Sequence, residues 1–389
     1  MSPPVPEVGV RSARTAVGWS FALNGWCFAS WASRIPDLRG DFGLSNAALG
    51  LVLLAIASGS LVALPTTGAM IGRWGTVRVV RSGTVLASVG LLVAGLGIAV
   101  GVLPLTVVGL LSYGTGTGSW DVAMNVEGAE VERRLGRSIM PKFHAGFSLG
   151  TVVGALGGAG VVALGVPPLA HLGAVAVLAG AASWRSSSLF LPVQPPPDEP
   201  VRARGAWLEQ RTLIIGLMVL ALAMTEGTAN DWLAVALVDG HDTSHALGVA
   251  GFAGFVAAMT VFRMLGAEAL DRFGRPAVLW ATIISAIVGV SMIVLGSGLV
   301  VVLGILLWGA GASLGFPVGM SAAADDPRRS AARVSVVSTI GYAAFLTGPP
   351  LVGFVGNHVG TLDSLWVVVA VLVPAAVTVP AARKPQPQQ

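Results

Sequence analysis

The chain has 389 residues, of which 54% are hydrophobic and only 11% are charged, whereas ordinary soluble domains carry about 25% charged residues. This deficit in charge extends along the whole length and excludes a conventional soluble protein. A net charge of +4 would suit a nucleic-acid partner, but the basic residues lie in the short breaks between apolar runs, a distribution typical of membrane topology signals.

Apolar runs long enough to cross a hydrocarbon core of about 30 Å recur along the chain, and in lipid such runs must be helices. We predict twelve membrane-spanning helices, at residues 14–36, 45–70, 78–100, 103–129, 138–165, 168–190, 210–237, 245–270, 276–296, 298–322, 333–356 and 362–382. Apart from Arg34, Arg39 and Arg263, all of the 23 lysines and arginines fall in the terminal segments and in alternate breaks. Because basic residues concentrate on the cytoplasmic side, we expect both termini in the cytoplasm.

The first predicted helix carries Asn24 on one face and Trp26 on another. Basic residues precede it, as they precede a cleaved signal peptide, but the helix has a counterpart about two hundred residues later, which favours a permanent part of the fold. Cys27 is the single cysteine and excludes an intrachain disulfide.

The fourth and fifth predicted helices contain ionisable residues. At about 100° per residue, one stripe of the fourth helix contains Gly114, Gly118, Asp121, Asn125 and Gly128. Asp121 lies about 13 Å along the helix from Glu130, and His144 lies about 10 Å from Arg137 on the fifth helix, so the two side chains occupy similar depths. We expect Asp121 and His144 to face each other, either sharing a transported proton or forming a structural hydrogen bond between the helices.

The segment 191–209, "LPVQPPPDEPVRARGAWLE", is the only long polar and proline-rich interruption, and such a composition is typical of a linker. We predict that it separates two six-helix bundles, at residues 1–190 and 210–389, and that it faces the cytoplasm.

The second half has its own polar set. Glu226 and Asn230 share a stripe of the seventh predicted helix, while Asp231 points elsewhere. Arg263 lies in the eighth, about 10 Å away in depth, and neither charge should be left unpaired in lipid. We expect a Glu226–Arg263 pair, either structural or gated by substrate or protons. Tyr342 lies on a polar face of the eleventh helix.

The two halves echo each other, which indicates an internal duplication of the kind found in many secondary transporters. "GRWGTVR" at 72–78 aligns with "DRFGRPA" at 271–277 at an offset of 199, and "ALGLV" at 48–52 with "ALGVA" at 246–250.

With these features the chain resembles the major facilitator superfamily, whose signature is a Gly-x-x-x-Asp-Arg-x-Gly-Arg loop after the second and eighth helices. "DVAMN" (121–125), "GRSIMPKFHAGFSLG" (136–150) and "GYAAFLTGPPLVGF" (341–354) are similar to the MosC/YbjJ-like branch of bacterial inner-membrane transporters. The resemblance implies an all-α membrane protein with twelve helices in two pseudo-symmetric six-helix bundles. It also implies a central cavity lined by helices one, four, seven and ten. One member of the branch is associated with rhizopines, which are inositol derivatives.

The resemblance further implies that the two loops gate the cytoplasmic side. The matching residues are Gly68, Arg73, Gly75, Asp271, Arg272, Gly274 and Arg275. We expect Arg73 to pair with Glu127, Glu130 or Glu132, and we expect Arg272 and Arg275 to pair with Asp325 or Asp326. Gly72 stands where the first loop should have its acid, which argues against a symmetric latch, and the alternative is that these charges only set topology.

We therefore predict a secondary transporter of a small polar solute (sugar-, polyol- or inositol-like) that is coupled to protons and works by alternating access as a monomer in a bacterial inner membrane. A drug or metabolite exporter is the first alternative, although "GFSLGTVVGALGG" (146–158) has Thr151 where drug antiporters have proline. A non-transporting membrane sensor is the second. No nucleophile–base pair or phosphate loop suggests an enzyme, and His241 and His245 lack a third metal ligand, so we expect no cofactor and no metal.

Overall fold

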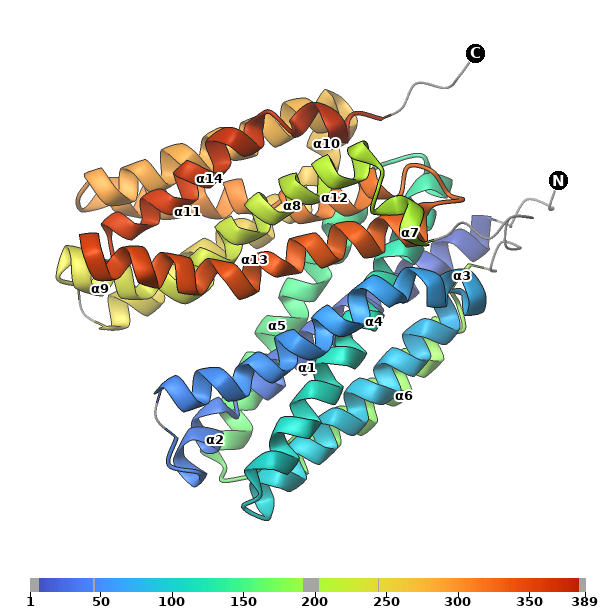
Figure 1. The fold of residues 1–389 in the computed structure, drawn as a ribbon, viewed down its shortest axis with the longest axis horizontal. Helices are drawn as coiled ribbons and strands as arrows, with labels where there is room; N and C mark the ends of the chain where they lie inside the picture. Colours follow the sequence, from blue (N-terminus) through green and yellow to red (C-terminus); the bar gives the residue numbers. More distant parts are fainter. Residues whose placement is uncertain (1–6, 45, 192–202, 244, 385–389) are drawn as a thin grey trace. The chain divides into compact units, whose positions relative to one another are not determined.

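The computed structural model describes residues 7–44, 46–191, 203–243 and 245–384. Helices make up nearly all of this described part, which contains no strand (Figure 1). The first half of the chain forms α1 (Glu7–Ala32), α2 (Ile35–Asp41), α3 (Asn46–Ala99), α4 (Leu103–Leu135), α5 (Met140–Ala163) and α6 (Pro168–Ser187). The short α2 occupies a break in which we predicted only a loop.

The second half contains more interruptions. It forms α7 (Ala203–Ala206), α8 (Gln210–Thr228), η1 (Ala229–Leu233), α9 (Ala234–His241), α10 (His245–Leu295), α11 (Leu299–Ala312), α12 (Gly315–Ala323), α13 (Ser330–Val359), η2 (Asp363–Leu365), α14 (Trp366–Ala376) and η3 (Val379–Ala382). The predicted linker at 191–209 falls largely on residues 192–202, which lie outside the described residues, and α7 forms in its last part.

Two long helices each combine two of the predicted spans. α3 is interrupted at Gly75 (φ 80°, ψ 163°) and α10 at Gly274 (φ 77°, ψ 162°). These positive φ values favour glycine, because a Cβ atom makes them strained. The two glycines are one repeat length apart and have nearly the same conformation, so the duplication seen in the sequence extends to the backbone of the loops.

Among the described residues, six helical segments are long and apolar enough to cross a bilayer: Leu51–Ala99, Met140–Ala163, Gln210–His241, Ala250–Leu295, Leu299–Ala323 and Ser330–Val359. Two of them, in α3 and α10, are the glycine-interrupted pairs. With these two pairs divided, and with α1, α4, α6 and the α14 segment added, the described residues follow the twelve predicted spans.

The described residues form two compact units. The first contains residues within 1–136, 143–205 and 326–335, and the second contains 137–142, 206–325 and 336–389. In the first unit α3, α4 and α6 run alongside one another (Figure 1). Gly90 of α3 lies against the backbone of Tyr113, and in the second unit Gly289 lies against the backbone of Trp308 in the same manner. Glycine at both positions lets neighbouring helices approach closely, as is common in membranes.

Candidate functional site

A buried chain of polar side chains joins α4 to α5 in the first unit. The amide nitrogen Nδ2 of Asn125 donates to the Asp121 backbone carbonyl at 2.9 Å and to Asp121 Oδ1 at 3.2 Å. His144 Nε2 lies 3.2 Å from Asn125 Oδ1. Asp121 is 7% exposed, Asn125 0% and His144 8%, so these three hydrogen-bonded side chains are all buried.

The order of these contacts fixes the direction of the hydrogen bonds. A carboxamide oxygen can only accept, so His144 Nε2 carries a hydrogen and donates it to Asn125, which in turn donates to Asp121. Asn125 contacts both side chains, so the contact between α4 and α5 depends on the hydrogen-bonding state of both ionisable groups. That Asp121 and His144 face each other stays a prediction.

Side chains of α1 pack against the same cluster. The ring of Phe21 lies 4.9 Å from the His144 ring, and the Trp120 indole donates to Ser20 Oγ at 2.7 Å. Asn24 is buried, and its Nδ2 has no hydrogen-bond partner within the described part of the chain. Trp26 is half-buried and lies on another face of α1, so the amide donor of Asn24 is a polar group that α1 adds beside this cluster.

The predicted ion pair between Glu226 and Arg263 is present in the second unit. Arg263 Nη2 lies 2.8 Å from Glu226 Oε2, with exposed fractions of 4% for Arg263 and 19% for Glu226. Arg263 Nε also donates to the backbone carbonyl of Ser313 at 3.1 Å. Ser313 lies at the break between α11 and α12, so the guanidinium pairs the carboxylate and at the same time satisfies a carbonyl at the helix end.

Asn230 and Asp231 both lie in η1, a π-helical turn in the seventh span, and both are exposed. Glu226 lies in α8, just before this turn, and the stripe that it shares with Asn230 stays a prediction. Such turns occur frequently at functional sites. Tyr342 of α13 is half-buried and packs edge-on against Phe316 at 6.1 Å between ring centroids.

The second signature loop forms an ion-pair network within the second unit. Arg275 Nη1 lies 2.8 Å from Asp325 Oδ1, as we expected, and Arg211 Nη2 lies 2.6 Å from Asp325 Oδ2. Arg272 does not join it, and our prediction for this residue was wrong: its guanidinium lies 5.1 Å from the Phe273 ring. Asp271 Oδ1 accepts the backbone N–H of Ser138 at 2.7 Å.

The first signature loop differs in its charge. Arg73 is exposed and forms no ion pair within the described residues, so the predicted pairing with acids of α4 was wrong. Glu127 accepts hydrogen bonds from the Thr76 hydroxyl and the Leu191 N–H, both at 2.6 Å. Glu130 is held by Arg133 and Arg134. Gly68 lies against the backbone at Ala331 and Ala332 in the same unit.

Thr76 and Arg211 are contact residues that the sequence reasoning missed. Thr76 stands at the position equivalent to Arg275, one repeat length earlier, and so replaces the guanidinium that pairs with the acid in the second unit. The alignment of the two loops carries this signal. Nothing comparable identified Arg211, because its contact with Asp325 joins distant parts of the chain.

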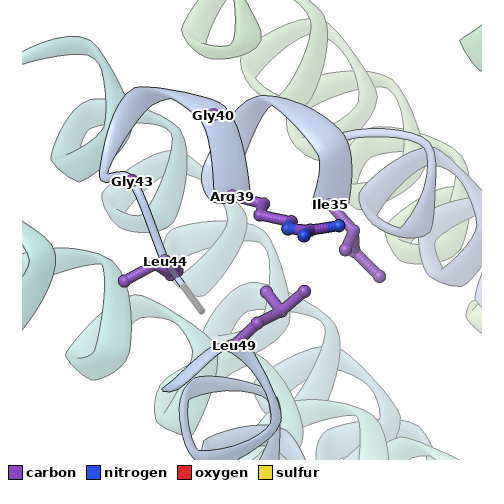
Figure 2. A pocket seen from close by; sticks show the side chains of 6 residues that line it. All are labelled: Ile35, Arg39, Gly40, Gly43, Leu44 and Leu49. Atoms are coloured by element: carbon purple, nitrogen blue, oxygen red, sulfur yellow. The ribbon is translucent and has the colours of Figure 1, made fainter. Parts of the chain in front are cut away.

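A cavity of about 570 Å³ lies at α2 rather than beside Asp121. Its lining residues are Ile35, Arg39, Gly40, Gly43, Leu44 and Leu49. In Figure 2 the Arg39 side chain extends from α2 beside Ile35 and above Leu49. None of these residues was predicted to belong to a site.

Known proteins resemble the chain over most of its length, although no protein-family model matches it. It is 34% identical to the uncharacterised transporter y4wD of Sinorhizobium fredii (88% of this chain, 90% of the relative). It is 32% identical to an uncharacterised MFS-type transporter of Yersinia pestis (89% of each). It is also 26% identical to the membrane protein MosC of Rhizobium meliloti (93% of this chain, 88% of the relative).

Solved structures agree on the fold. The major facilitator transporter FucP in its outward conformation superposes with a TM-score of 0.81 at 14% identity, covering 96% of this chain and 99% of FucP. The proton:xylose symporter XylE gives 0.76 at 14% identity, covering 96% and 95%. With two relatives above 30% identity over nearly nine-tenths of the chain, the protein belongs to the major facilitator superfamily, a family of multi-pass membrane transporters with twelve helices in two six-helix bundles rather than of enzymes.

Proposed function

We propose that the protein is a proton-coupled secondary transporter of a small, hydroxyl-rich solute, resembling a sugar, polyol or inositol, in a bacterial inner membrane. Its termini face the cytoplasm, following the distribution of its basic residues. The observation that carries this proposal is the buried Asp121–Asn125–His144 chain, because an ionisable group inside a membrane protein is costly and is usually retained for function.

The hydrogen-bond order suggests how a proton on Asp121 affects the helices. When Asp121 is ionised, its Oδ1 is a strong acceptor for Asn125, and Asn125 in turn accepts from His144 on α5. Protonation of the carboxylate weakens this acceptor. The α4–α5 contact therefore responds to the proton, which is what coupling to alternating access requires.

The solute class follows from the side chains near this cluster. Asn24 has an amide donor with no partner in the described structure, and an amide suits hydroxyl groups as both donor and acceptor. FucP is described as a fucose:proton symporter and XylE as a proton:xylose symporter, which accords with a sugar-like solute and proton coupling.

Glu226 and Arg263 are the proposed gating pair of the second unit. Glu226 is partly exposed while Arg263 is buried, so a solute or proton can reach the carboxylate. Neutralising Glu226 would remove the carboxylate partner of the guanidinium, which also contacts the backbone carbonyl of Ser313 at the α11–α12 break.

A thermal-shift screen of the purified protein tests the proposal. The panel contains sugars, polyols and inositols beside amino acids and lipophilic cations. We expect stabilisation by hydroxyl-rich solutes in the wild type and a weaker response in Asn24→Ala. Ser30→Ala is the matched control, because the Ser30 hydroxyl is on the same helix and fully buried. A response to lipophilic cations alone would instead identify an exporter.

A further inference from the structure

A second cavity, whose surface is mostly apolar, lies at the end of the first unit where α3 resumes after Gly75 and where α6 ends. It has a volume of about 320 Å³ and is lined by Arg78, Arg81, Ser82, Val85 and Trp184. This volume is at the lower end of the range of about 300–1,000 Å³ of small-ligand sites. Trp184 is 53% exposed and Val85 49%, so the cavity opens on the face of the unit that lipid covers.

The guanidinium of Arg81 is held in one orientation by neutral groups. Its Nε donates to Ser187 Oγ at 3.1 Å, and its Nη2 donates to Ser188 Oγ at 2.7 Å and to the Trp184 carbonyl at 3.2 Å. The guanidinium carbon lies 4.5 Å from the centroid of the Trp184 ring. These contacts fix the position of the charge and leave Nη1 available.

No carboxylate neutralises this cavity within the described structure. Arg81 has only neutral partners, and Arg78 is exposed and forms no ion pair there. Elsewhere in the chain Arg133, Arg263 and Arg275 are each paired with a carboxylate. The cavity therefore combines two uncompensated guanidinium groups, a hydroxyl and an indole.

These groups suit a phosphate. Guanidinium groups donate charge-assisted hydrogen bonds to phosphate, for which Arg81 retains Nη1, and tryptophan favours the interface between headgroups and hydrocarbon. Arg81 lies about 9 Å along the helix from Gly75, so it is near the end of its apolar span. Basic pockets between transmembrane helices at this depth bind the headgroups of anionic lipids.

We propose that Arg78, Arg81 and Trp184 form a binding site for the phosphate group of an anionic phospholipid, whose acyl chains lie along the exposed apolar face beside Val85. Bound lipid bridges α3 and α6, because the cavity is lined by Arg78 and Arg81 of α3 and by Trp184 of α6. The site is separate from the Asp121 cluster and does not depend on the solute transported.

The test is lipid binding to the purified full-length protein, measured as thermal stabilisation by phosphatidylglycerol added to phosphatidylcholine nanodiscs. We expect stabilisation of the wild type. Arg81→Lys keeps the charge but loses the contacts with Ser187, Ser188 and Trp184 that hold Nη1 in place, so the half-maximal phosphatidylglycerol fraction should rise several-fold. Arg78→Gln removes a charge but leaves the Arg81 contacts in place, and we expect the half-maximal phosphatidylglycerol fraction to rise about fivefold. This figure follows from about 1 kcal/mol for each basic residue near the membrane surface, where about 1.4 kcal/mol corresponds to a tenfold change in affinity.

Arg185→Lys and Arg185→Gln are the matched controls, because Arg185 is exposed on α6 next to Trp184 but does not line the cavity. We expect no change for Arg185→Lys and a smaller change for Arg185→Gln than for Arg78→Gln. Equal effects at Arg185 and Arg78 would show general attraction to the membrane and overturn the site. Inorganic phosphate is the second arm: if it stabilises the wild type as well as phosphatidylglycerol does, and Arg81→Lys abolishes this, the site takes a soluble phosphate and not a lipid.

Discussion

Replacing Glu226 by glutamine leaves the guanidinium of Arg263 in the second unit without its carboxylate partner. Arg263 is only 4% exposed, and its Nε donates to the neutral carbonyl of Ser313. Removing one partner of a buried pair costs about 3–5 kcal/mol. Because the carboxylate side of this pair is 19% exposed, we expect a loss near the lower end, about 3 kcal/mol.

The reverse substitution should cost less. Arg263→Gln leaves a carboxylate that can still reach water, and we expect a loss of about 2 kcal/mol, within the usual range for an unsatisfied buried group. In the double variant neither charge remains, and the loss should be smaller than the sum of the single losses by about 2 kcal/mol, within the usual range for residues in direct contact.

The free energy of unfolding in mixed detergent micelles, followed by circular dichroism, provides the measurement. Arg272→Gln is the matched control, because Arg272 lies on α10, as Arg263 does, is exposed and has no ion pair in the described structure. It should change stability by less than about 0.5 kcal/mol. Single losses that add within about 0.5 kcal/mol in the double variant would refute an interaction between Glu226 and Arg263.

Three further predictions concern the loops, the end of α4 and the topology. Gly75→Ala and Gly274→Ala should each lower the free energy of unfolding by about 1–3 kcal/mol, since both residues have positive φ. Gly72→Ala is the control: a Cβ atom at Gly72 of α3 meets open space, so this change should be neutral or stabilising in the same unfolding assay. Burial opposes ionisation of Glu130, but hydrogen bonds from Arg133 and Arg134 outweigh it and hold its pKa below 4.5. The stability that ionised Glu130 contributes is therefore present above pH 4.5 and is lost as the pH falls through the lowered pKa. Glu130→Gln should flatten the dependence of melting temperature on pH in that range. An unchanged profile would count against a role of Glu130 in stability. In a variant without Cys27, a cysteine introduced at Gln194 should not react with an impermeant thiol reagent added to intact cells. Labelling from outside would show that the predicted topology is inverted.

The periodicity of apolar residues predicted the helices well, because a run of about 20 apolar residues has few alternatives in lipid. It also predicted the Glu226–Arg263 contact, since helix depth follows from residue number and both side chains are long. The bridging by Asn125 could not be predicted in this way. Residue spacing places Asp121 and His144 at one depth but does not say which other side chain contacts both of them.

The error at Arg73 has an identifiable physical cause. The residue equivalent to the pairing Arg275 is Thr76, not Arg73. Arg73 is equivalent to Arg272, and both lack an ion pair in the described structure. The π turn η1 was not predicted, because no residue of Ala229–Leu233 signals it.

The role of Asp121 in proton coupling is tested most directly by transport in proteoliposomes, using the solute that most stabilises the purified protein. Asp121→Asn keeps the shape of the side chain and removes its ability to ionise, and Asp41→Asn, an exposed residue of α2, is the control. We predict that Asp121→Asn still exchanges solute across the membrane but no longer accumulates it when a pH gradient is imposed, while Asp41→Asn behaves as the wild type. Accumulation by Asp121→Asn at the wild-type level would contradict this role and assign the carboxylate to structure alone.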